Sequence, residues 1–464
     1  MKLVEEGYEK KKDKTKTTAT IVLVLIFIII LIIIGILIAM SQIKEQGLRV
    51  MIDNSYSETA LNEMFFEDGK IYVKIRGIAG YLGYESYNGE YNNKSEEASK
   101  CYIEGENEVV NFALNSKKIY KLNLENESNY EYFYIDEPII ARGGALYTTA
   151  EGIASAFNVS FIYDEQAQTI NIFTLPYLVS AYSSAILDYG YTQMSEDFED
   201  SKAILQSMAI VRKNDYGVVN IQTGEVIIEP KYDSIKYIPT TGEFLVESNK
   251  KVGIIDKNKS MKVQLIYDSI GLMDSDSGLY VVKKDNKYGV IDLKGNIKIH
   301  LEYDKIGIDA TQFEKNDIKN GYILADNLIP VCRDNLWGMY DKTGNLVVDL
   351  EYTNFGYTAK TNKDAMNLLV IPNYDVIVAE KEGKYLLINA YGKKVLEVLV
   401  DDIYMTIESN EYRYYILAND KRRDAEKYLD SQGIVAKDEN GEILNKNAIS
   451  NTTKKSNETN TSEN

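Results

Sequence analysis

Histidine is the side chain that most often transfers protons in catalysis, and this chain contains it only once, as His300. A Ser-His or Cys-His pair would have to use His300, and the zinc motif H-E-x-x-H needs two histidines. The sequence also lacks a G-x-S-x-G nucleophile elbow and a glycine-rich phosphate loop. Among 70 carboxylates, a pair at glycosidase spacing would occur by chance. We therefore predict a protein that is not an enzyme and has no catalytic residues.

Metal-ligand patterns are equally sparse. The sequence DSDSG at residues 274–278 faintly resembles a calcium loop, but its glycine comes one position early and Asp285 replaces the closing glutamate. We expect a polar turn there, and an ordinary strand residue at His300. Cys101 and Cys332 are the only cysteines. A disulfide between them is possible outside the cell, but we expect two unpaired thiols. We predict no metal site and no cofactor.

The charge balance argues against one class of partner. The chain of 464 residues carries 52 Lys plus Arg and 70 Asp plus Glu, so its formal net charge is −18. Nucleic-acid binding draws on a basic face that neutralises phosphates, and no basic face is visible in the sequence. We therefore expect no nucleic-acid partner.

Residues 21–40, IVLVLIFIIILIIIGILIAM, form an uncharged apolar run long enough to cross a bilayer as a helix. A cleaved signal peptide has a shorter apolar core and an A-x-A-like site, which is absent here. Lysines are in excess before the run, at Lys2, Lys10, Lys11, Lys12, Lys14 and Lys16. Because lysine excess marks the cytoplasmic side, we expect a single-pass cell-membrane protein with a cytoplasmic N-terminus and its bulk outside the cytoplasm.

Between residues 50 and 175 the chain repeats a short pattern. The segments KIYVKIRGIAGYLGYE from Lys70 and ALYTTAEGIASAFNVSF from Ala145 both predict a strand followed by a helix. Thr148 and Glu151 predict a capping box at the second helix. Gly83 and Asn158 stand where the chain must leave each helix in a left-handed conformation. The run VSFIYDEQAQTINIF predicts a hairpin after the second helix.

A second repeat covers residues 201–419. The dipeptides Tyr216-Gly217, Tyr288-Gly289 and Trp337-Gly338 recur, with Val252-Gly253 as a variant. A tyrosine follows each glycine after 14 or 15 residues, and these are Tyr232, Tyr267, Tyr303 and Tyr352. A fifth, eroded copy has Leu386 in place of the glycine and Val400 in place of the tyrosine.

Each repeat of about 36 residues predicts three strands with turns, which is short of a four-stranded propeller blade. Gly295 and Gly344 can supply the positive φ of the tight turn after the aromatic-Gly strand. Such a unit cannot bury its apolar face alone and must stack on its copies. The sequence therefore predicts an array that is either propeller-like or an open solenoid.

The two patterns resemble known families. The segments from Asp68 to Glu85 and from Ile135 to Ile172 resemble the stalk domain, also called the copper amine oxidase N-terminal-like domain, of exported Gram-positive bacterial proteins. The aromatic-Gly units resemble WG repeats, which implies a β-rich domain with a binding or scaffolding role. Lys74 and Thr149 occupy places where the stalk family usually has proline. Copper favours imidazole and soft sulfur ligands, so a chain with one histidine is not expected to bind it.

The recurring aromatic residues leave two interpretations open. We expect them chiefly to be packing residues, because tyrosine suits strand surfaces generally. Some could instead form a recognition surface for sugars or peptides. The binding candidates are Tyr216, Tyr288, Trp337, Tyr232, Tyr267, Tyr303 and Tyr352.

These observations predict a membrane-anchored α+β protein, in which a small α/β stalk-like domain precedes an all-β WG-repeat domain. The expected segments are a cytoplasmic tail at 1–20, a transmembrane helix at 21–40, the stalk domain at 50–175, a linker at 176–200, five repeats at 201–419, an extension at 420–444 and a disordered tail at 445–464. The expected function is non-catalytic binding or scaffolding at the cell envelope, with an envelope protein or a cell-wall polymer as partner. The alternatives are a membrane receptor or regulator that works through a partner and, less favoured, an envelope hydrolase.

Overall fold

The computed structural model describes residues 47–89, 91, 99–124, 130–195, 197–273, 277–313, 321–359, 365–409, 411–437 and 443–445. The predicted membrane span at 21–40, the tails at 1–20 and 446–464, and residues 274–276 of the DSDSG segment lie outside this set. Within these ranges no helix combines the length and the apolar composition that a membrane crossing requires.

The repeated pattern near the N-terminus folds as two strand-helix units, as predicted. Strand β4 (Lys70–Lys74) leads into α2 (Ile75–Tyr81), and β11 (Ala145–Thr149) leads into α3 (Ala150–Phe157). The two strands pair antiparallel at the centre of the sheet β10-β11-β4-β3, which relates the copies by an approximate two-fold. Gly83 and Asn158 both have positive φ, at 85° and 51°, as expected of residues that end a helix. Strands β12 (Ser160–Asp164) and β13 (Thr169–Phe173) form the predicted hairpin.

The predicted capping residue of α3 was wrong by one position. Thr149, not Thr148, is the N-cap, and its hydroxyl accepts a hydrogen bond from the Gly152 amide at 3.2 Å. Thr148 pairs with Val73 inside the sheet and is fully buried. Its side chain packs against Gly152 in the first turn of α3, but its hydroxyl makes no hydrogen bond to the helix.

Most of the N-terminal core lies between these helices and a five-stranded antiparallel sheet that the sequence analysis did not resolve. Its strands are β5 (Glu85–Asn88), β6 (Lys100–Glu104), β7 (Glu108–Ala113), β8 (Lys118–Asn123) and β9 (Tyr130–Tyr134). The remaining strands of the domain are β1 (Arg49–Ile52), β2 (Ser55–Tyr56), β3 (Met64–Glu67) and β10 (Ile140–Arg142), with the 3-10 turn η1 at Ala60–Glu63. Ile103, Val110 and Phe112 share one buried cluster with Ile78 of α2 and Ile153 of α3.

The described residues of the region 176–200, which was predicted as a linker, include two helices. Helix α4 (Leu175–Asp188) begins at Thr174, whose hydroxyl caps the Tyr177 amide and donates to Asp53 of the N-terminal domain at 2.7 Å. Helix α5 (Phe198–Ser201) and the 3-10 turn η2 (Lys202–Gln206) then lead into the repeats. The connection is therefore packed against both domains.

Each repeat contains four antiparallel strands, not the predicted three. The first sheet comprises β14 (Gln193–Met194), β15 (Met208–Arg212), β16 (Tyr216–Asn220) and β17 (Val226–Tyr232). The second comprises β18 (Ser234–Ile238), β19 (Glu243–Ser248), β20 (Lys251–Ile255) and β21 (Met261–Tyr267). A single residue separates β17 from β18. The sequence pattern therefore did not distinguish the first strand of the second sheet from the last strand of the first sheet.

The next three sheets follow the same order. The third is β22 (Ser269–Leu272), β23 (Leu279–Lys284), β24 (Lys287–Asp292) and β25 (Ile297–Tyr303). The fourth is β26 (Lys305–Ile306), β27 (Leu328–Arg333), β28 (Leu336–Asp341) and β29 (Leu346–Tyr352), with the 3-10 turn η3 at Ala310–Gln312. The fifth is β30 (Asn354–Phe355), β32 (Val376–Lys381), β33 (Lys384–Asn389) and β34 (Lys394–Val400), with β31 (Val370–Ile371) on β32.

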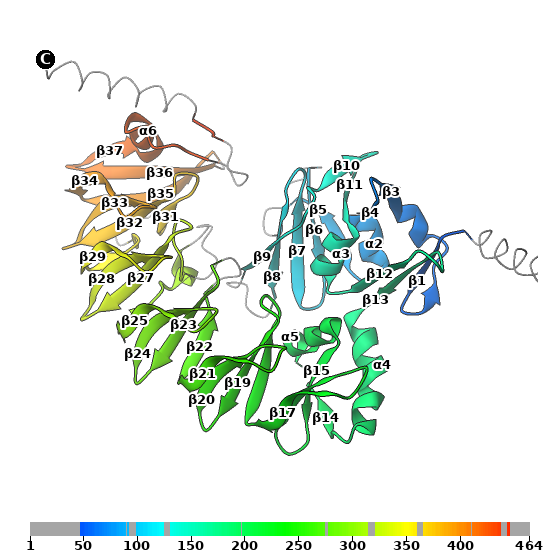
Figure 1. Ribbon diagram of the computed structural model, residues 1–464. Coiled ribbons are helices and arrows are strands. Elements are labelled where there is room, and N and C mark those ends of the chain that lie inside the picture. The colour runs from blue at the N-terminus through cyan, green and yellow to red at the C-terminus, as the bar shows by residue number, and fades with distance from the viewer. Residues whose placement is uncertain are drawn as a thin grey trace, which may run out of the picture.

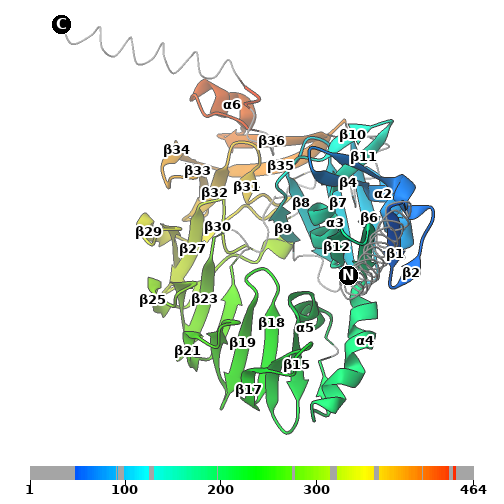
Figure 2. The same cartoon turned by 45° about the vertical axis from the view of Figure 1, so that its right-hand side comes forward.

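A sixth sheet ends the array and extends into the predicted C-terminal extension. It has three strands, β35 (Asp402–Glu408), β36 (Glu411–Ala418) and β37 (Lys421–Asp424), and is followed by helix α6 (Ala425–Ser431). The six sheets stack face to face along an open arc, with the N-terminal domain beside its inner side (Figures 1 and 2). The first and last sheets stand at opposite ends of this arc, so the array is an open stack rather than a closed ring.

The glycine of the aromatic-Gly pair allows a close backbone approach within each sheet. A β-bulge shifts the register between the third and fourth strands beside this residue. A Cβ atom on Gly289 would lie 2.7 Å from the Ile299 carbonyl oxygen and 2.9 Å from the Leu301 side chain. In the fifth sheet Leu386 takes this position and is buried, whereas Val398, which corresponds to Leu301, is 70% exposed. In the fifth sheet the buried Leu386 therefore fills the space beside the bulge, and the fourth-strand residue Val398 points into solvent instead.

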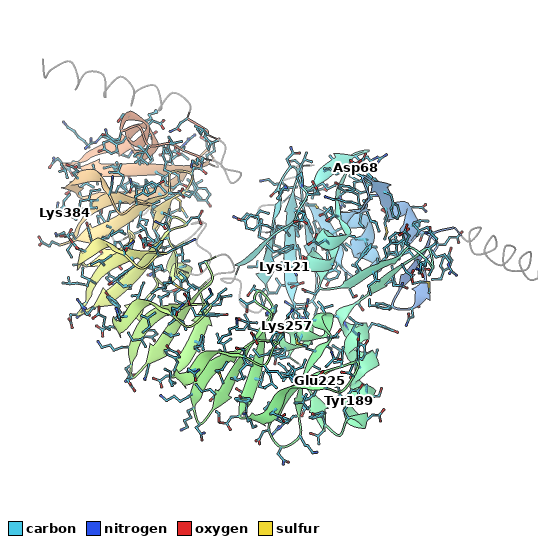
Figure 3. The ribbon with its side chains drawn as sticks, in the orientation of Figure 1. Asp68, Lys121, Tyr189, Glu225, Lys257 and Lys384 are labelled. Atoms are coloured by element: carbon cyan, nitrogen blue, oxygen red, sulfur yellow. The ribbon has the colours of Figure 1, made fainter. Side chains whose placement is uncertain are left out.

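One buried network joins the two domains. Glu108 of β7 accepts from the Asn158 amide at 2.7 Å and lies 3.4 Å from the Lys121 ammonium. Its other oxygen lies 3.8 Å from the ammonium of Lys202, which belongs to the entry of the repeat array. All four side chains are at least nine-tenths buried, and Figure 3 shows Lys121 on the side of the N-terminal domain that faces the array. Charges at this depth are tolerated because they compensate one another.

We expect Gly289→Ala to lower the free energy of unfolding of the array by about 1–3 kcal/mol, because the new methyl group meets backbone that cannot retreat. Urea unfolding followed through Trp337, the single tryptophan, measures the effect. Gly271→Ala in β22 is the matched control, since its Cβ would meet only a Val281 methyl group at 3.4 Å. Equal stability of the two variants would contradict the prediction.

We expect Glu108→Ala to lower the free energy of unfolding by about 3–5 kcal/mol, because it removes the buried carboxylate next to the Lys121 ammonium and the acceptor of the Asn158 amide. Lys202 keeps its closer partner Glu199, at 2.8 Å. Chemical denaturation followed by circular dichroism tests this. Glu106→Ala, two residues away and exposed, should have little effect. A neutral Glu108→Ala variant would show that water reaches the network.

Candidate binding surface

The recurring aromatic residues occupy matching positions in successive sheets. Tyr216 pairs with Tyr232, Tyr288 with Tyr303 and Trp337 with Tyr352 across the third and fourth strands. Tyr267 holds the same place opposite Val252. The structure therefore places one pair in each sheet along the arc and does not bring the candidates into a single site.

The fourth-strand tyrosines are packing residues. Tyr232, Tyr267, Tyr303 and Tyr352 are between 1% and 6% exposed and lie in apolar clusters between adjacent sheets. The Tyr303 hydroxyl is 2.6 Å from the Tyr340 hydroxyl, and burial raises the pKa of Tyr303 above its usual value. Tyr216, Tyr288 and Trp337 are half-buried, and cations lie over the first two rings, Arg212 at 5.2 Å and Lys283 at 5.1 Å. Only these three could contribute part of a ring to a ligand.

The aspartate that follows the tyrosine joins two sheets. Asp304 accepts hydrogen bonds from the Lys287 ammonium of the third sheet at 2.6 Å and from the Asp334 amide of the fourth sheet at 2.9 Å. Asp268 binds Lys251 and the Asp285 amide in the same way, at 2.6 and 2.8 Å. Asp401 repeats the arrangement with Lys384 and the Asn419 amide. We call this three-part contact the Lys-Asp-turn staple.

The amide partner belongs to a tight turn between the second and third strands of the next sheet. Both central residues of this turn have positive φ, for example Asp285 at 52° and Asn286 at 62°. Such turns match the twist of antiparallel strands, and Asn and Asp tolerate them. The lysine directly follows the turn, one position before the aromatic residue. The sequence analysis identified neither the aspartate nor the lysine as a contact residue, although the two are separated by a constant 17 residues.

The fourth sheet has lost both side chains of the staple, and the first sheet has lost its lysine. In the fourth sheet Leu336 replaces the lysine and Thr353 replaces the aspartate, so both partners are lost together. Thr353 instead donates to the Glu380 carbonyl at 3.1 Å. In the first sheet Asp215 takes the lysine position, and Asp233 keeps only its bond from the Asn249 amide.

A row of exposed apolar side chains crosses the turns between the third and fourth strands. Its members are Leu293, Ile297, Leu346 and Tyr391, which are 37%, 50%, 44% and 76% exposed. The turns are stacked closely, because a Cβ on Gly344 would meet the Lys298 carbonyl oxygen at 2.5 Å and one on Gly392 the Val347 oxygen at 2.8 Å. Gly295 and Gly344 have φ of 80° and 95°, as predicted for these turns. We call these four residues the turn row.

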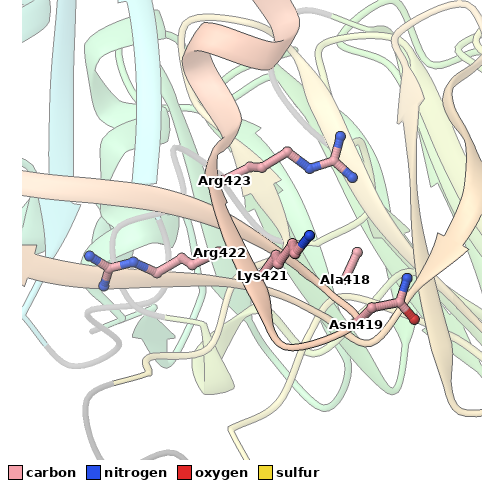
Figure 4. Close-up of a pocket in the computed structure, with 5 residues that line it drawn as sticks. All are labelled: Ala418, Asn419, Lys421, Arg422 and Arg423. Carbon is pink, nitrogen blue, oxygen red and sulfur yellow. The ribbon is translucent and has the colours of Figure 1, made fainter.

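A basic edge ends the array. Lys421, Arg422 and Arg423 are exposed on β37 and line an open hollow of about 560 Å³ together with Ala418 and Asn419 (Figure 4). The Arg422 guanidinium stacks over the Tyr415 ring at 4.1 Å, and Arg423 faces Tyr428 of α6 at 6.0 Å. Arg422 also reaches Glu408 at 3.4 Å.

The reactive side chains that the sequence analysis singled out do not form a centre. His300 lies exposed on β25, and Cys101 and Cys332 are both buried and unpaired, as expected. Burial raises the pKa of the Cys101 thiol to about 12, so it stays protonated. In the part of the chain that the structure describes, no three His, Cys, Asp or Glu side chains are grouped as metal ligands.

The staple predicts an acid-sensitive array. The lysine hydrogen bond, followed by the backbone amide, lowers the pKa of Asp304 in the folded state, so its contribution is complete above the unfolded value near 3.9 and is lost as the pH falls through the folded-state pKa. We expect the free energy of unfolding of the Asp304→Asn variant to fall less than that of the wild type below about pH 5, because the variant has no carboxylate at this position to protonate. Urea midpoints across this pH range, read from Trp337 fluorescence, measure it. Asp188→Asn, at an exposed helix end, is the control, and parallel profiles for all three proteins would contradict the prediction.

Comparison with solved structures found distant likenesses. A "Crystal structure of the eukaryotic initiation factor" is 12% identical over 70% of this chain and 83% of its own, with a TM-score of 0.24. PorZ, described as a surface component of the type-IX secretion system of Porphyromonas gingivalis, is 9% identical over 71% of this chain and 45% of its own, with a TM-score of 0.19. KlHsv2 with a replaced loop is 7% identical over 68% of this chain and 95% of its own, with a TM-score of 0.20. Scores this low carry no inference, and no curated protein matches the sequence.

Family models match both parts of the chain. The model described as "Copper amine oxidase N-terminal domain" matches residues 51–172, and "WG containing repeat" matches residues 216–246, 253–288, 288–308 and 337–359. Both families are non-catalytic. The matched N-terminal region contains no histidine and a single, buried cysteine, so its residues do not fit a copper site. The chain is therefore a WG-repeat protein that carries a copper amine oxidase N-terminal domain.

Proposed function

We propose that this protein is a non-catalytic binding or scaffolding protein at the cell envelope. In this proposal residues 21–40 anchor the chain in the cell membrane, and both the stalk domain and the WG repeats face outward. The apolar length of that segment and the lysine excess before it support the orientation. The net charge of −18 disfavours close contact with anionic wall polymers, so we favour an exported or membrane protein as the partner.

The turn row is the observation that carries this proposal. Exposed apolar side chains that line up across several sheets mark protein contacts more often than isolated ones do. The four side chains of the row are exposed, whereas the fourth-strand tyrosines of the motif are buried in the contacts between sheets. Tyr391 is a suitable anchor because tyrosine supplies a large apolar area with a polar end.

Capture with the full-length protein tests the proposal. We expect it to retain a discrete envelope protein from detergent-solubilised membranes, and to bind purified cell-wall sacculi weakly with or without calcium. Leu346→Asp with Tyr391→Asp should reduce retention at least tenfold, since burying the new carboxylates in an apolar contact is unfavourable.

A matched variant controls for charge alone. Ile162→Asp changes a residue that is 51% exposed on the stalk domain and should leave retention unchanged. Saturable binding to sacculi without a protein partner would overturn the preference for a protein ligand. Protease protection of residues after position 40 in intact cells would overturn the proposed orientation.

A further inference from the structure

Among the residues that the structure describes, the sixth sheet of the array has three strands, whereas each of the first five has a fourth. In the first five sheets the third strand pairs on its outer side with a fourth strand, which is β17, β21, β25, β29 or β34. In the sixth, β37 occupies the third position, and the sheet order stops there as β35-β36-β37. Helix α6 begins at Ala425, so the chain turns away where a fourth strand would otherwise start to pair.

The unfinished sheet also leaves a staple without its aspartate. Lys421 directly follows the turn at Asn419 and Asp420, whose φ values are 49° and 60°, and so corresponds to Lys251, Lys287 and Lys384. Each of those lysines binds the aspartate that follows a fourth strand. No ion pair is found for Lys421 or Arg423 among the residues that the structure describes, and both line the hollow of Figure 4.

We propose that the open edge of β37 binds an extended, carboxylate-bearing segment of a partner protein, which supplies the missing strand. Exposed strand edges are templates for added strands, and main-chain hydrogen bonds provide the contact. Lys421, Arg422 and Arg423 make this edge locally positive, although the protein as a whole has a net charge of −18. Electrostatic complementarity therefore favours an acidic segment at this edge. This assignment names a partner chemistry for the binding role proposed above and rests on it, although it concerns a different surface.

The complete sheets show which side chains the segment should carry. Tyr303 stands opposite Tyr288, so the corresponding residue of the added segment stands opposite Arg422. An aromatic side chain at that position can stack on the Arg422 guanidinium, as Tyr415 of the neighbouring strand β36 already does. A carboxylate at the next position reaches Lys421, as Asp304 reaches Lys287. Only the last few residues of the segment can pair, because β37 spans four residues.

A peptide taken from the chain itself is a suitable probe. Residues 296–304, NIKIHLEYD, form the fourth strand of the third sheet and end in the required tyrosine and aspartate. We expect a fluorescent version to bind the full-length protein with salt-sensitive affinity, and a version with Asp304→Lys in the peptide to bind at least tenfold more weakly.

Charge variants of the protein locate the site. Lys421→Glu with Arg423→Glu should weaken binding at least tenfold, whereas Lys257→Glu with Lys294→Glu makes the same charge change at exposed turns and should not. Circular dichroism and Trp337 fluorescence verify that both variants are folded. No binding up to about 1 mM peptide, or equal loss in both variants, would overturn the assignment.

Two further outcomes separate this proposal from the proposed function. If the Lys421→Glu, Arg423→Glu variant still retains its envelope protein while no peptide binds, the binding role stands and the edge assignment falls. If the purified protein instead forms a dimer that this variant abolishes, the edge belongs to a second copy of the chain and the assignment to an acidic partner is overturned.

Discussion

Stacking of one small sheet on the next is the constraint on which the whole array depends. A four-stranded sheet of this size has two apolar faces and cannot bury either one by itself. The clusters between sheets draw residues from both neighbours, as Ile299 and Tyr303 of the third sheet meet Ile329 and Val331 of the fourth. Burial of this kind is the main stabilising contribution, and every other recurring contact adjusts its geometry.

The recurring motif is best understood as the set of residues that makes this stacking repeatable. The glycine beside the bulge lets the fourth strand approach, the turn glycine lets one sheet approach the previous one, and the staple fixes the offset between neighbouring sheets. Exposed ion pairs contribute little by themselves, so the staple serves register more than stability. The fourth sheet nevertheless stacks on the fifth without a lysine or an aspartate in the staple positions, so apolar burial is sufficient for stacking at that step.

The two domains are joined by a different kind of contact. A buried group of Glu108, Lys121 and Lys202 is a poor source of net stability, but it is intolerant of any rearrangement that separates its members. Together with the bond between Thr174 and Asp53, it holds the first sheet against the stalk domain. The array is therefore fixed at its first end, and its last end carries the unfinished sheet and the basic edge.

Sequence periodicity alone determined much of this organisation, because repeated local signals reinforce one another. It identified the two strand-helix copies, their left-handed exits at Gly83 and Asn158, the turn glycines and five copies of the repeat. The two families came instead from the resemblance of the quoted motifs to known ones. It also favoured packing over recognition for the aromatic residues, which holds for Tyr232, Tyr267, Tyr303 and Tyr352. The choice among Tyr216, Tyr288 and Trp337 needed exposure, which no sequence pattern specifies.

Only the tertiary structure decided the rest, and in each case the reason is that the contact joins segments far apart in sequence. Thr148 became a core residue because of its pairing with Val73. The fourth strand per sheet was hidden because β18 follows β17 after one residue. The staple, the turn row and the network around Glu108 arise only when neighbouring sheets or domains meet. The sequence specifies the repeating unit, whereas the way these units stack decides which of its residues remain available to a partner.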